Sequence, residues 1–392
     1  MKPFFVCLLL FRTIYGFAYD ISEHAEISLL TADPGTELYS VFGHSAVRVN
    51  DTVNGIDWVY NYGTFDFNTS HFYIKFARGK LQYMLTRDRF RHFLPEYIYS
   101  DRSVYEQVLN LAYEEKKRMV EFLEWNLLPE NRFYKYDFFY DNCATRIRDL
   151  VTDNINPVIY FDTTKMIKKR SFRDLIDFYL KNMKWNKFGI DLALGLPADK
   201  IAEPREYMFL PDWMKEAFSG AQIEDGRRLI KKSQVIFKGS EQSVPPTIIT
   251  PKLVLWLLFL IGILSLMNKR FSLIYDKTLF FASGLTGIII FLLWFATDHS
   301  TTHYNYNLLW AIPVHFVAAF YIGKENKYWG VRLYFMITFV IAFFTLILWG
   351  TIPQNLNEAL IPLVLILFIK SAKISGADQW LRKLLMQRGQ VW

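Results

Sequence analysis

One cysteine, Cys143, is the residue with the clearest capacity for chemistry in this chain of 392 residues. The other cysteine of the sequence, Cys7, lies in an apolar N-terminal run of the kind that directs export. Exported proteins usually hold their cysteines in disulfide pairs, and Cys143 has no partner in the expected mature chain. We therefore expect Cys143 to be either a small buried hydrophobic residue or a reactive thiol.

The residues around Cys143 favour a reactive thiol. An aromatic run at residues 133–140 has the pattern of a strand and ends at Asp141 and Asn142, two residue types that often cap helices. A helix is therefore predicted to begin with Cys143 in its first turn. The backbone N–H groups and the dipole at a helix N-terminus stabilise negative charge, so they lower the pKa of a thiol. The same N–H groups could hold the oxyanion of a tetrahedral intermediate.

A cysteine nucleophile needs a base within hydrogen-bond reach, which is normally a histidine. His44 is the best candidate because it lies within a predicted strand beside Gly43, where close approach of the backbone is allowed. His24 is close to the expected mature N-terminus, and His71 and His92 lie in polar stretches typical of a surface. A lone histidine in a strand is more often structural, but a single thiol at a helix start makes His44 the predicted base.

A third group should orient the imidazole. The strand predicted to pair with that of His44 offers Asp57, Asn61 and Tyr62. We prefer Asn61 among these three, although the register that decides between them does not follow from the sequence.

The elements that must position these residues indicate an α+β domain at residues 19–240. The dipeptide Asn54-Gly55 predicts a two-residue hairpin turn between two of its strands. Periodicity and turn residues predict strands at residues 26–31, 39–49, 56–63, 80–85 and 104–111, and helices at 70–77 and 113–125.

The second half of the chain consists of long apolar runs separated by short polar loops. Each run is near the length of about 20 residues that crosses about 30 Å of hydrocarbon. The last run is short and contains Pro362. We predict an all-α transmembrane domain of about five helices, at residues 247–267, 278–297, 307–323, 332–349 and 358–372, followed by a tail at 373–392.

Charge predicts the orientation of these spans. The first and third loops and the tail carry lysine and arginine, whereas the second and fourth loops carry neither. Basic loops are cytoplasmic, so the N-terminal domain faces outward and the C-terminus faces the cytoplasm.

Residues 1–18 independently predict a signal peptide cleaved after Ala18, with an uncleaved anchor as the alternative. The net charge of +7 is too small and too scattered to indicate nucleic-acid binding.

The second loop, residues 297–307, is dense in hydrogen-bonding groups and lies on the same side as the soluble domain. It contains Asp298, His299, Asn305 and Asn307. The loop is either an ordinary polar connection or the lipid-facing side of an active site. Its histidines do not have metal-ligand spacing with any other cluster, so we predict no metal site.

Several segments of the chain resemble a known family. A histidine strand followed by a cysteine helix is similar to the circularly permuted relatives of papain and the NlpC/P60 hydrolases. More specifically, the chain resembles the Lnb-type lipoprotein N-acyltransferases. The segments that carry the resemblance are Phe42-Gly43-His44-Ser45-Ala46, residues 59–67, Pro129-Glu130-Asn131-Arg132, Asp141-Asn142-Cys143-Ala144-Thr145-Arg146, residues 189–195 and residues 305–310.

The resemblance implies an enzyme of the bacterial inner membrane that needs no cofactor. Cys143 would take an acyl group from a membrane phospholipid as a thioester and pass it to the α-amine of the N-terminal cysteine of a diacylated lipoprotein. His44 would act as acid and base in both steps, with Asn61 as its partner. The residues expected to support the site or bind substrate are Tyr62, Asp141, Asn142, Arg146, Asp298, His299, Asn305 and Asn307.

Other functions stay open. A membrane-tethered cysteine hydrolase acting on cell-wall peptides, amides or lipids would use the same residues, although a single anchor would suffice for tethering. In a non-enzymatic envelope module, Cys143 would simply be buried.

Three further interpretations concern other positions of the chain. Residues 189–195 are expected to pack, with Asp191 buried and paired, and residues 165–173 are expected to form a basic surface. Arg146 and Arg148 flank the thiol and either contact lipid phosphate, further favour the thiolate, or line a solvated helix face.

Overall fold

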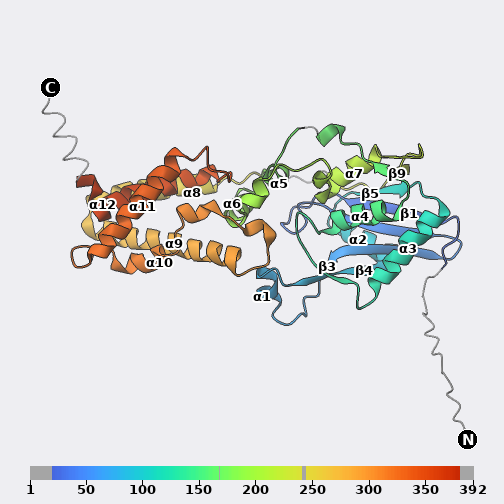
Figure 1. Ribbon diagram of the computed structural model, residues 1–392, viewed down its shortest axis with the longest axis horizontal. Helices are drawn as coiled ribbons and strands as arrows, with labels where there is room; N and C mark the ends of the chain where they lie inside the picture. The colour runs from blue at the N-terminus through green and yellow to red at the C-terminus, as the bar shows by residue number, and fades with distance from the viewer. Residues whose placement is uncertain (1–19, 167, 241–243, 380–392) are drawn as a thin grey trace, which may run out of the picture.

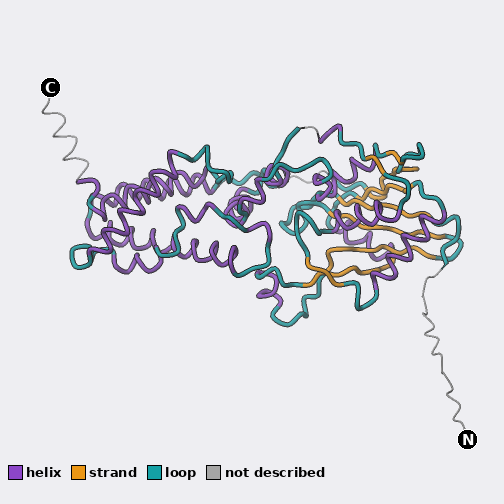
Figure 2. The backbone as a smooth tube through the Cα atoms, in the orientation of Figure 1, coloured by secondary structure: helices purple, strands orange, loops and turns teal. Residues whose placement is uncertain are grey.

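A computed structural model describes residues 20–166, 168–240 and 244–379 and places a sheet domain at one end and a helical bundle at the other (Figures 1 and 2). The predicted signal peptide, with Cys7, lies outside the described residues, as does most of the predicted tail.

The sheet domain is built on a seven-stranded antiparallel sheet with the order β6-β4-β3-β2-β1-β5-β9. Its strands are β1 Glu26–Ala32, β2 His44–Asp51, β3 Ile56–Thr64, β4 Gln82–Arg89, β5 Val104–Leu109, β6 Phe133–Lys135 and β9 Ile230–Phe237. Two further strands, β7 Ile159–Tyr160 and β8 Gln222–Ile223, form a separate pair.

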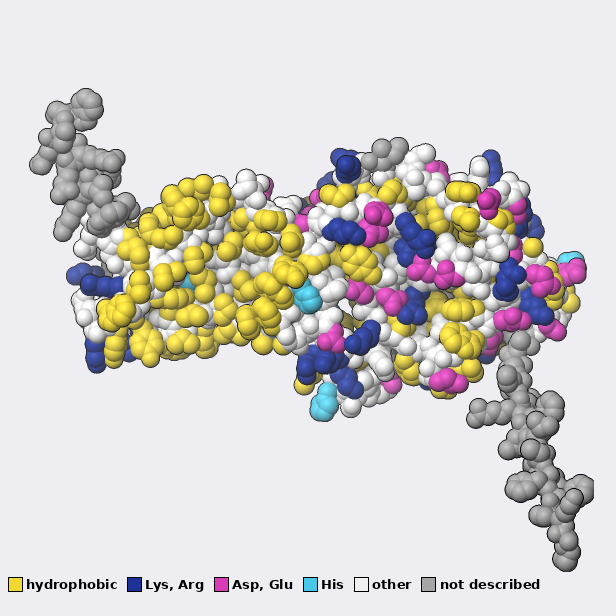
Figure 3. All heavy atoms as spheres, viewed as in Figure 1, with side chains coloured by type: hydrophobic (Ala, Val, Ile, Leu, Met, Phe, Trp, Pro, Cys, Tyr) yellow, Lys and Arg dark blue, Asp and Glu magenta, His cyan; other side chains and the backbone are white. Residues whose placement is uncertain are grey.

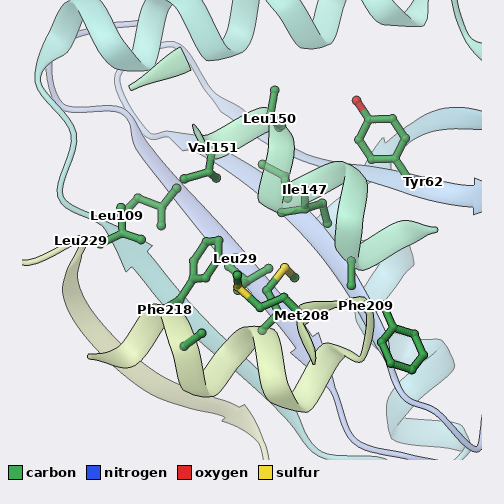
Figure 4. Close-up of a cluster of buried hydrophobic side chains, with 14 of the residues drawn as sticks. Leu29, Tyr62, Leu109, Ile147, Leu150, Val151, Met208, Phe209, Phe218 and Leu229 are labelled. Atoms are coloured by element: carbon green, nitrogen blue, oxygen red, sulfur yellow. The ribbon is translucent and has the colours of Figure 1, made fainter. Parts of the chain in front are cut away.

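Helices cover both faces of the sheet, so the interior strand β1 is buried along almost its whole length. On one face, α4 and α7 pack their apolar side chains together with residues of β1 (Figure 4). On the other face, α2 packs against β2 and β3 through Phe93 and Tyr97. The helices of this domain are α1 Phe72–Ala77, α2 Phe90–Tyr99, α3 Tyr113–Leu127, α4 Cys143–Asn154, α5 Phe172–Tyr179, α6 Lys184–Ala193 and α7 Pro211–Ser219.

The α+β class and most elements predicted before residue 130 are confirmed, with two corrections. The second strand begins at His44 rather than at residue 39, because residues 38–42 form a turn. The hairpin around Asn54-Gly55 pairs Asp51 with Ile56, so its loop has four residues and not two. The sequence did not predict β9, the last strand of the domain. This strand pairs with β5 and forms one edge of the sheet.

The helical bundle departs from the five predicted spans. Two helices, α9 and α11, are long and apolar enough to cross a membrane, and α8 with its continuation to Met267 is shorter. The third predicted span, residues 307–323, is wrong as a continuous helix: it is broken into short turns around Pro313, which has no N–H to donate. The helices are α8 Pro251–Leu264, α9 Lys269–Phe295, α10 His315–Ala318, α11 Trp329–Ile347 and α12 Ile361–Ser375.

Many large apolar side chains of the bundle are exposed. On the face seen in Figure 3, charged side chains are sparse along the bundle until its far end, where lysine and arginine side chains gather. A soluble protein rarely exposes so continuous an apolar surface, whereas a lipid-facing surface requires it.

The junction between the two parts is held by hydrogen bonds to one short segment, residues 191–199. The amide of Asn305 donates to the carbonyl oxygens of Leu192 and Ala193 at 2.8 and 3.2 Å, and the amide of Asn307 donates to that of Asp191 at 3.2 Å. The backbone of Gly195 lies so close to the same loop that a Cβ there would stand 1.8 Å from a carbonyl oxygen. Only glycine therefore fits at this position.

A buried arginine, Arg173, holds this segment from the other side. Its guanidinium lies 3.0 Å from the carboxylate of Asp191 and 2.9 Å from that of Asp199, and it also donates to two carbonyl oxygens of the segment. Asp191 further accepts from Asn357 of the membrane half at 2.7 Å. The prediction that Asp191 is buried and paired is confirmed. The prediction of a basic surface at residues 165–173 is wrong for Arg173, because its side chain is fully enclosed by these partners.

We expect Arg173→Met to destabilise the protein severely. Methionine fills a similar volume but leaves the buried carboxylate of Asp199 without a cation and that of Asp191 with Lys187 alone, which costs about 3–5 kcal/mol. Thermal unfolding of the detergent-solubilised protein should show a much lower midpoint.

The matched control is Arg205→Met, which removes a more exposed arginine that pairs with Asp149 at 2.9 Å. A surface pair of this kind contributes about 0–1 kcal/mol, so the midpoint should change little. Equal midpoints for the two variants would contradict the role given to Arg173.

Candidate active site

Cys143 is the first residue of α4, as predicted, and its neighbour Asn142 is the N-cap. The side-chain oxygen of Asn142 accepts from the backbone N–H groups of Ala144 and Thr145 at 2.8 and 2.9 Å. The amide nitrogen donates to the carbonyl oxygens of Phe138 and Phe209, both at 2.8 Å. Asn142, which was expected to support the site, is a buried cap that fixes the start of α4.

His44 is the first residue of β2, and it is hydrogen-bonded to the Cys143 thiol. Its Nε2 lies 3.2 Å from the side-chain oxygen of Asn61 on β3. An amide oxygen can only accept, so Nε2 carries a proton and Nδ1 is left for the thiol. Ala46 and Val59 pack on the α2 face of the sheet, and His44 and Asn61, two residues away along each strand, face the same way.

The electrostatics of the pair favour a thiolate beside an imidazolium. Burial opposes ionisation of both groups, so it raises the pKa of the thiol and lowers that of the imidazole. The charge and hydrogen bond that each group gives the other outweigh burial: the pKa of Cys143 is lowered overall and that of His44 is raised. The backbone N–H groups of Ser45 and Ala144 also lower the pKa of Cys143.

The end of β3 is shaped to let the thiol approach. Pairing of β3 with β4 is irregular between Asn61 and Thr64, and Gly63 between them has a left-handed conformation with φ +89°. A Cβ on Gly63 would stand 3.7 Å from that of Cys143, so any longer side chain would compete with the thiol for space.

A cleft of about 640 Å³ opens beside His44. Its walls are largely aromatic, which suits a long apolar group, and two charged residues lie among them. The residues that line the cleft are Tyr39, Ser40, Gly43, His44, Asn61, Tyr62, Gly63, Thr64, Phe65, Phe67, Phe93, Glu96, Tyr97 and Arg102.

Arg102 is a member of this cleft that the sequence analysis missed. Its side chain is 6% exposed, its Nε donates to the carbonyl oxygen of Asp33 at 2.8 Å, and its guanidinium lies 5.0 Å from the centre of the Tyr97 ring. Its Nη2 is buried and has no hydrogen-bond partner among the described residues. Its charge opposes protonation of His44. A lone arginine before β5 gives no sequence signal, because only the packing of α2 brings it to the cleft.

Other predicted site residues are engaged within the protein. The hydroxyl of Tyr62 donates to Asn126 at 2.7 Å, and its ring lies in the core next to α4 (Figure 4). Arg146 makes two hydrogen bonds to Asp141, at 2.6 and 2.8 Å, and its guanidinium stacks 3.6 Å from the centre of the Tyr134 ring. The expectation that Arg146 contacts lipid phosphate therefore does not fit, because Asp141 already neutralises it.

The two halves of the second loop have different positions. Asp298 pairs with Lys135 at 3.1 Å, and His299 contacts the carbonyl oxygen of Phe76 at 3.2 Å, so this half lies against the ends of β6 and α1. Asn305 and Asn307 are buried in the junction described above, and their contacts there correspond to the structural alternative. Within the described ranges, no cluster of three or more histidine, cysteine or acidic residues is placed to hold a metal ion.

Family models match both halves of the chain. A model of the Lnb N-terminal periplasmic domain matches residues 18–176, and a model of the Lnb transmembrane domain matches residues 241–377. The first match contains the thiol, the imidazole and Asn61. No curated protein and no solved structure matches the chain.

We expect the rate–pH profile for the reaction of Cys143 with iodoacetamide to have its midpoint at a lower pH than the profile of an ordinary thiol. Replacing His44 by Ala removes the charge and hydrogen bond that lower the pKa of Cys143, while burial, which raises it, remains. The midpoint of the rate–pH profile should therefore move upward, to or above the usual value of about 8.5. Mass spectrometry of the alkylated peptide, with Cys7→Ser as background, measures this rate.

His92→Ala is the matched control because His92 is exposed and contacts Asp88 and Arg91 rather than the thiol. A profile unchanged by His44→Ala would show that the imidazole does not stabilise the thiolate.

Proposed function

Because this chain belongs to the Lnb family of lipoprotein N-acyltransferases, we propose that it moves a fatty acyl group from a membrane phospholipid to the α-amine of the N-terminal diacylglyceryl-cysteine of a lipoprotein. The observation that carries the proposal is the hydrogen-bonded series Cys143, His44 and Asn61 at the edge of an aromatic cleft. The order of a histidine strand before a cysteine helix also supports a permuted papain-like origin of the domain.

In the first half-reaction, the Cys143 thiolate attacks the ester carbonyl of the phospholipid. The tetrahedral oxyanion forms beside the start of α4. Ala144 and Thr145 already donate to the Asn142 cap, so we assign the backbone N–H of Cys143 to the oxyanion. The imidazolium of His44 gives its proton to the departing alcohol, which leaves as a lysophospholipid. The products are an acyl thioester on Cys143 and a neutral His44.

In the second half-reaction, the neutral α-amine of the lipoprotein attacks the thioester carbonyl. His44 accepts the proton that the nitrogen loses as the amide forms. The thiolate leaves, so the thiolate–imidazolium pair is restored and no cofactor is consumed. An ester is exchanged for an amide, which supplies the driving force.

The architecture supports lipid substrates. The N-terminal domain is periplasmic and is attached to a transmembrane domain, so the cleft lies on the outward side of the membrane. We propose the inner membrane as the location and a cytoplasmic C-terminus, because the basic loops predict this orientation. Donor and acceptor are then both anchored in the leaflet next to the cleft, which a domain tethered by a flexible single anchor would not guarantee.

In cells without another N-acyltransferase, we expect Cys143→Ala and His44→Ala to abolish N-acylation of lipoproteins. Both remove a group that acts in each half-reaction, so lipoprotein N-terminal peptides should lose the mass of one acyl chain in mass spectra. Cells with wild-type protein or His92→Ala should keep it. Persistent N-acylation in both catalytic variants would sink the proposal, and release of free fatty acid without N-acylation by the wild type would favour the hydrolase instead.

We expect Asn61→Ala to slow acyl transfer by about tenfold or more, since correct orientation of the acid–base group contributes much of its effect. The hydrogen bond that His44 donates to Asn61 raises the pKa of His44, so its loss lowers that pKa. Since the reaction needs the imidazolium of His44, the alkaline limb of the pH–rate profile should then move to lower pH. A pH–rate profile measures this shift, and a variant that is slower at every pH with an unmoved profile would argue for a purely structural role.

A further inference from the structure

The short helix α1 exposes apolar side chains to an unusual degree. Tyr73, Ile74 and Phe76 are 81, 59 and 52% exposed, and the helix has no buried residue. Three apolar side chains of this six-residue helix are therefore turned outward, and their exposed surfaces gain little stability from packing. Such a surface indicates that something apolar covers it.

Basic side chains flank this surface. Lys75, Arg78 and Lys80 belong to the same segment, and the last two are exposed. Over α1 in Figure 3, lysine and arginine side chains gather beside the start of the apolar bundle. Apolar and aromatic side chains with adjacent lysine and arginine are the composition of a segment that lies in the headgroup region of a membrane.

Contacts with the transmembrane domain place α1 at the level of the membrane surface. The backbone N–H of Asp298, three residues beyond the end of α9, donates to the carbonyl oxygen of Arg78 at 2.9 Å. His299 reaches the carbonyl oxygen of Phe76 at 3.2 Å. The last residue of α9, Phe295, is 61% exposed, so the lipid-facing surface of this spanning helix continues towards α1.

An aromatic path leads from α1 to the cleft. The ring of Phe76 lies 6.3 Å from that of Phe72, which lies 5.0 Å from that of Phe67 and 5.6 Å from that of Phe65. Phe65 and Phe67 line the cleft that also contains His44. The exposed surface of α1 and the reactive centre are thus joined by contacting rings.

We propose that the segment from Phe65 to Lys80, which contains α1, rests in the periplasmic leaflet of the membrane, where its rings guide a lipid acyl chain into the cleft and its basic side chains meet lipid phosphate. The occupant of the exposed surface is the bilayer itself, because the surface is continuous with the lipid-facing side of α9. The guidance of an acyl chain rests on the proposed acyltransferase function, whereas the contact with the leaflet does not.

The contact is tested by an environment-sensitive nitrobenzoxadiazole label on Ile74→Cys, in a Cys7→Ser and Cys143→Ala background. The protein is reconstituted in vesicles of phosphatidylethanolamine and phosphatidylglycerol, with and without lipid that carries a doxyl quencher near the headgroup. We expect blue-shifted emission and strong quenching for this label, because it lies among the upper acyl carbons.

Val53→Cys is the matched control. Val53 is 62% exposed but lies in the β2–β3 hairpin loop, whose Asn54 contacts Asp20 at the end of the sheet domain away from the bundle (Figure 1). Its label should emit as in water and escape quenching. If the Ile74 label behaves like the Val53 label, the membrane contact is overturned, including the case in which another protein covers α1.

Guidance of the acyl chain is tested in the catalytically intact protein with Tyr73→Ser, Ile74→Ser and Phe76→Ser combined. We expect the rate with a long-chain phospholipid donor to fall about tenfold, since this apolar contact with the leaflet is lost. Acylation of Cys143 by a water-soluble short-chain thioester should stay within about twofold, because its path does not cross α1. Equal loss with both donors, or no loss with either, would overturn guidance.

The two experiments separate this inference from the proposed function. A quenched Ile74 label together with a wild-type protein that N-acylates nothing would leave the leaflet contact standing and refute the acyltransferase. An unquenched label on a protein that N-acylates lipoproteins would refute the leaflet contact alone.

Discussion

The rest of the structure depends on how one buried cation, the guanidinium of Arg173, is neutralised. Two carboxylates on a single short segment form ion pairs with it. Backbone carbonyl oxygens of the same segment accept hydrogen bonds from the side-chain amides of Asn305 and Asn307 in the membrane half. A buried charge without its partners is strongly destabilising, so the segment has little freedom to move. The sheet domain is thereby held in one orientation on the bundle, and its cleft keeps a constant relation to the membrane.

In the reactive centre, the opposite charges of the thiolate and the imidazolium stabilise each other. Burial alone would keep the thiol and the imidazole neutral, but each supplies the charge that the other needs. The two groups come from the start of β2 and the start of α4, which meet only because α4 packs across the sheet and Gly63 leaves room at the end of β3. The elements that form the core therefore also determine the reactivity of the thiol.

The second loop of the membrane half links these two features. Its last residues enter the junction, and its first residues contact the ends of α1 and β6. The ring of Phe72 on α1 in turn contacts Phe65 and Phe67, which line the cleft. A loop that could be taken for a simple connection thus joins the spanning helices to the walls of the candidate site. An enzyme that draws on membrane lipids needs such continuity, because its substrates reach it along the bilayer rather than through water.

The sequence by itself determined the features that depend on near neighbours in the chain: the helix start at Cys143 from its Asp-Asn caps, the choice of His44 from its place in a strand beside Gly43, and the apolar runs of the second half. Asn61 could be preferred but not distinguished from Asp57 or Tyr62, because strand register decides which side chain faces the imidazole. Only the tertiary structure brought Arg102 to the cleft, turned Tyr62 and Arg146 inward, and placed Asn305 and Asn307 in the junction. These outcomes follow from packing between segments that are far apart in the sequence. Local sequence patterns do not predict which polar groups will pair across such segments.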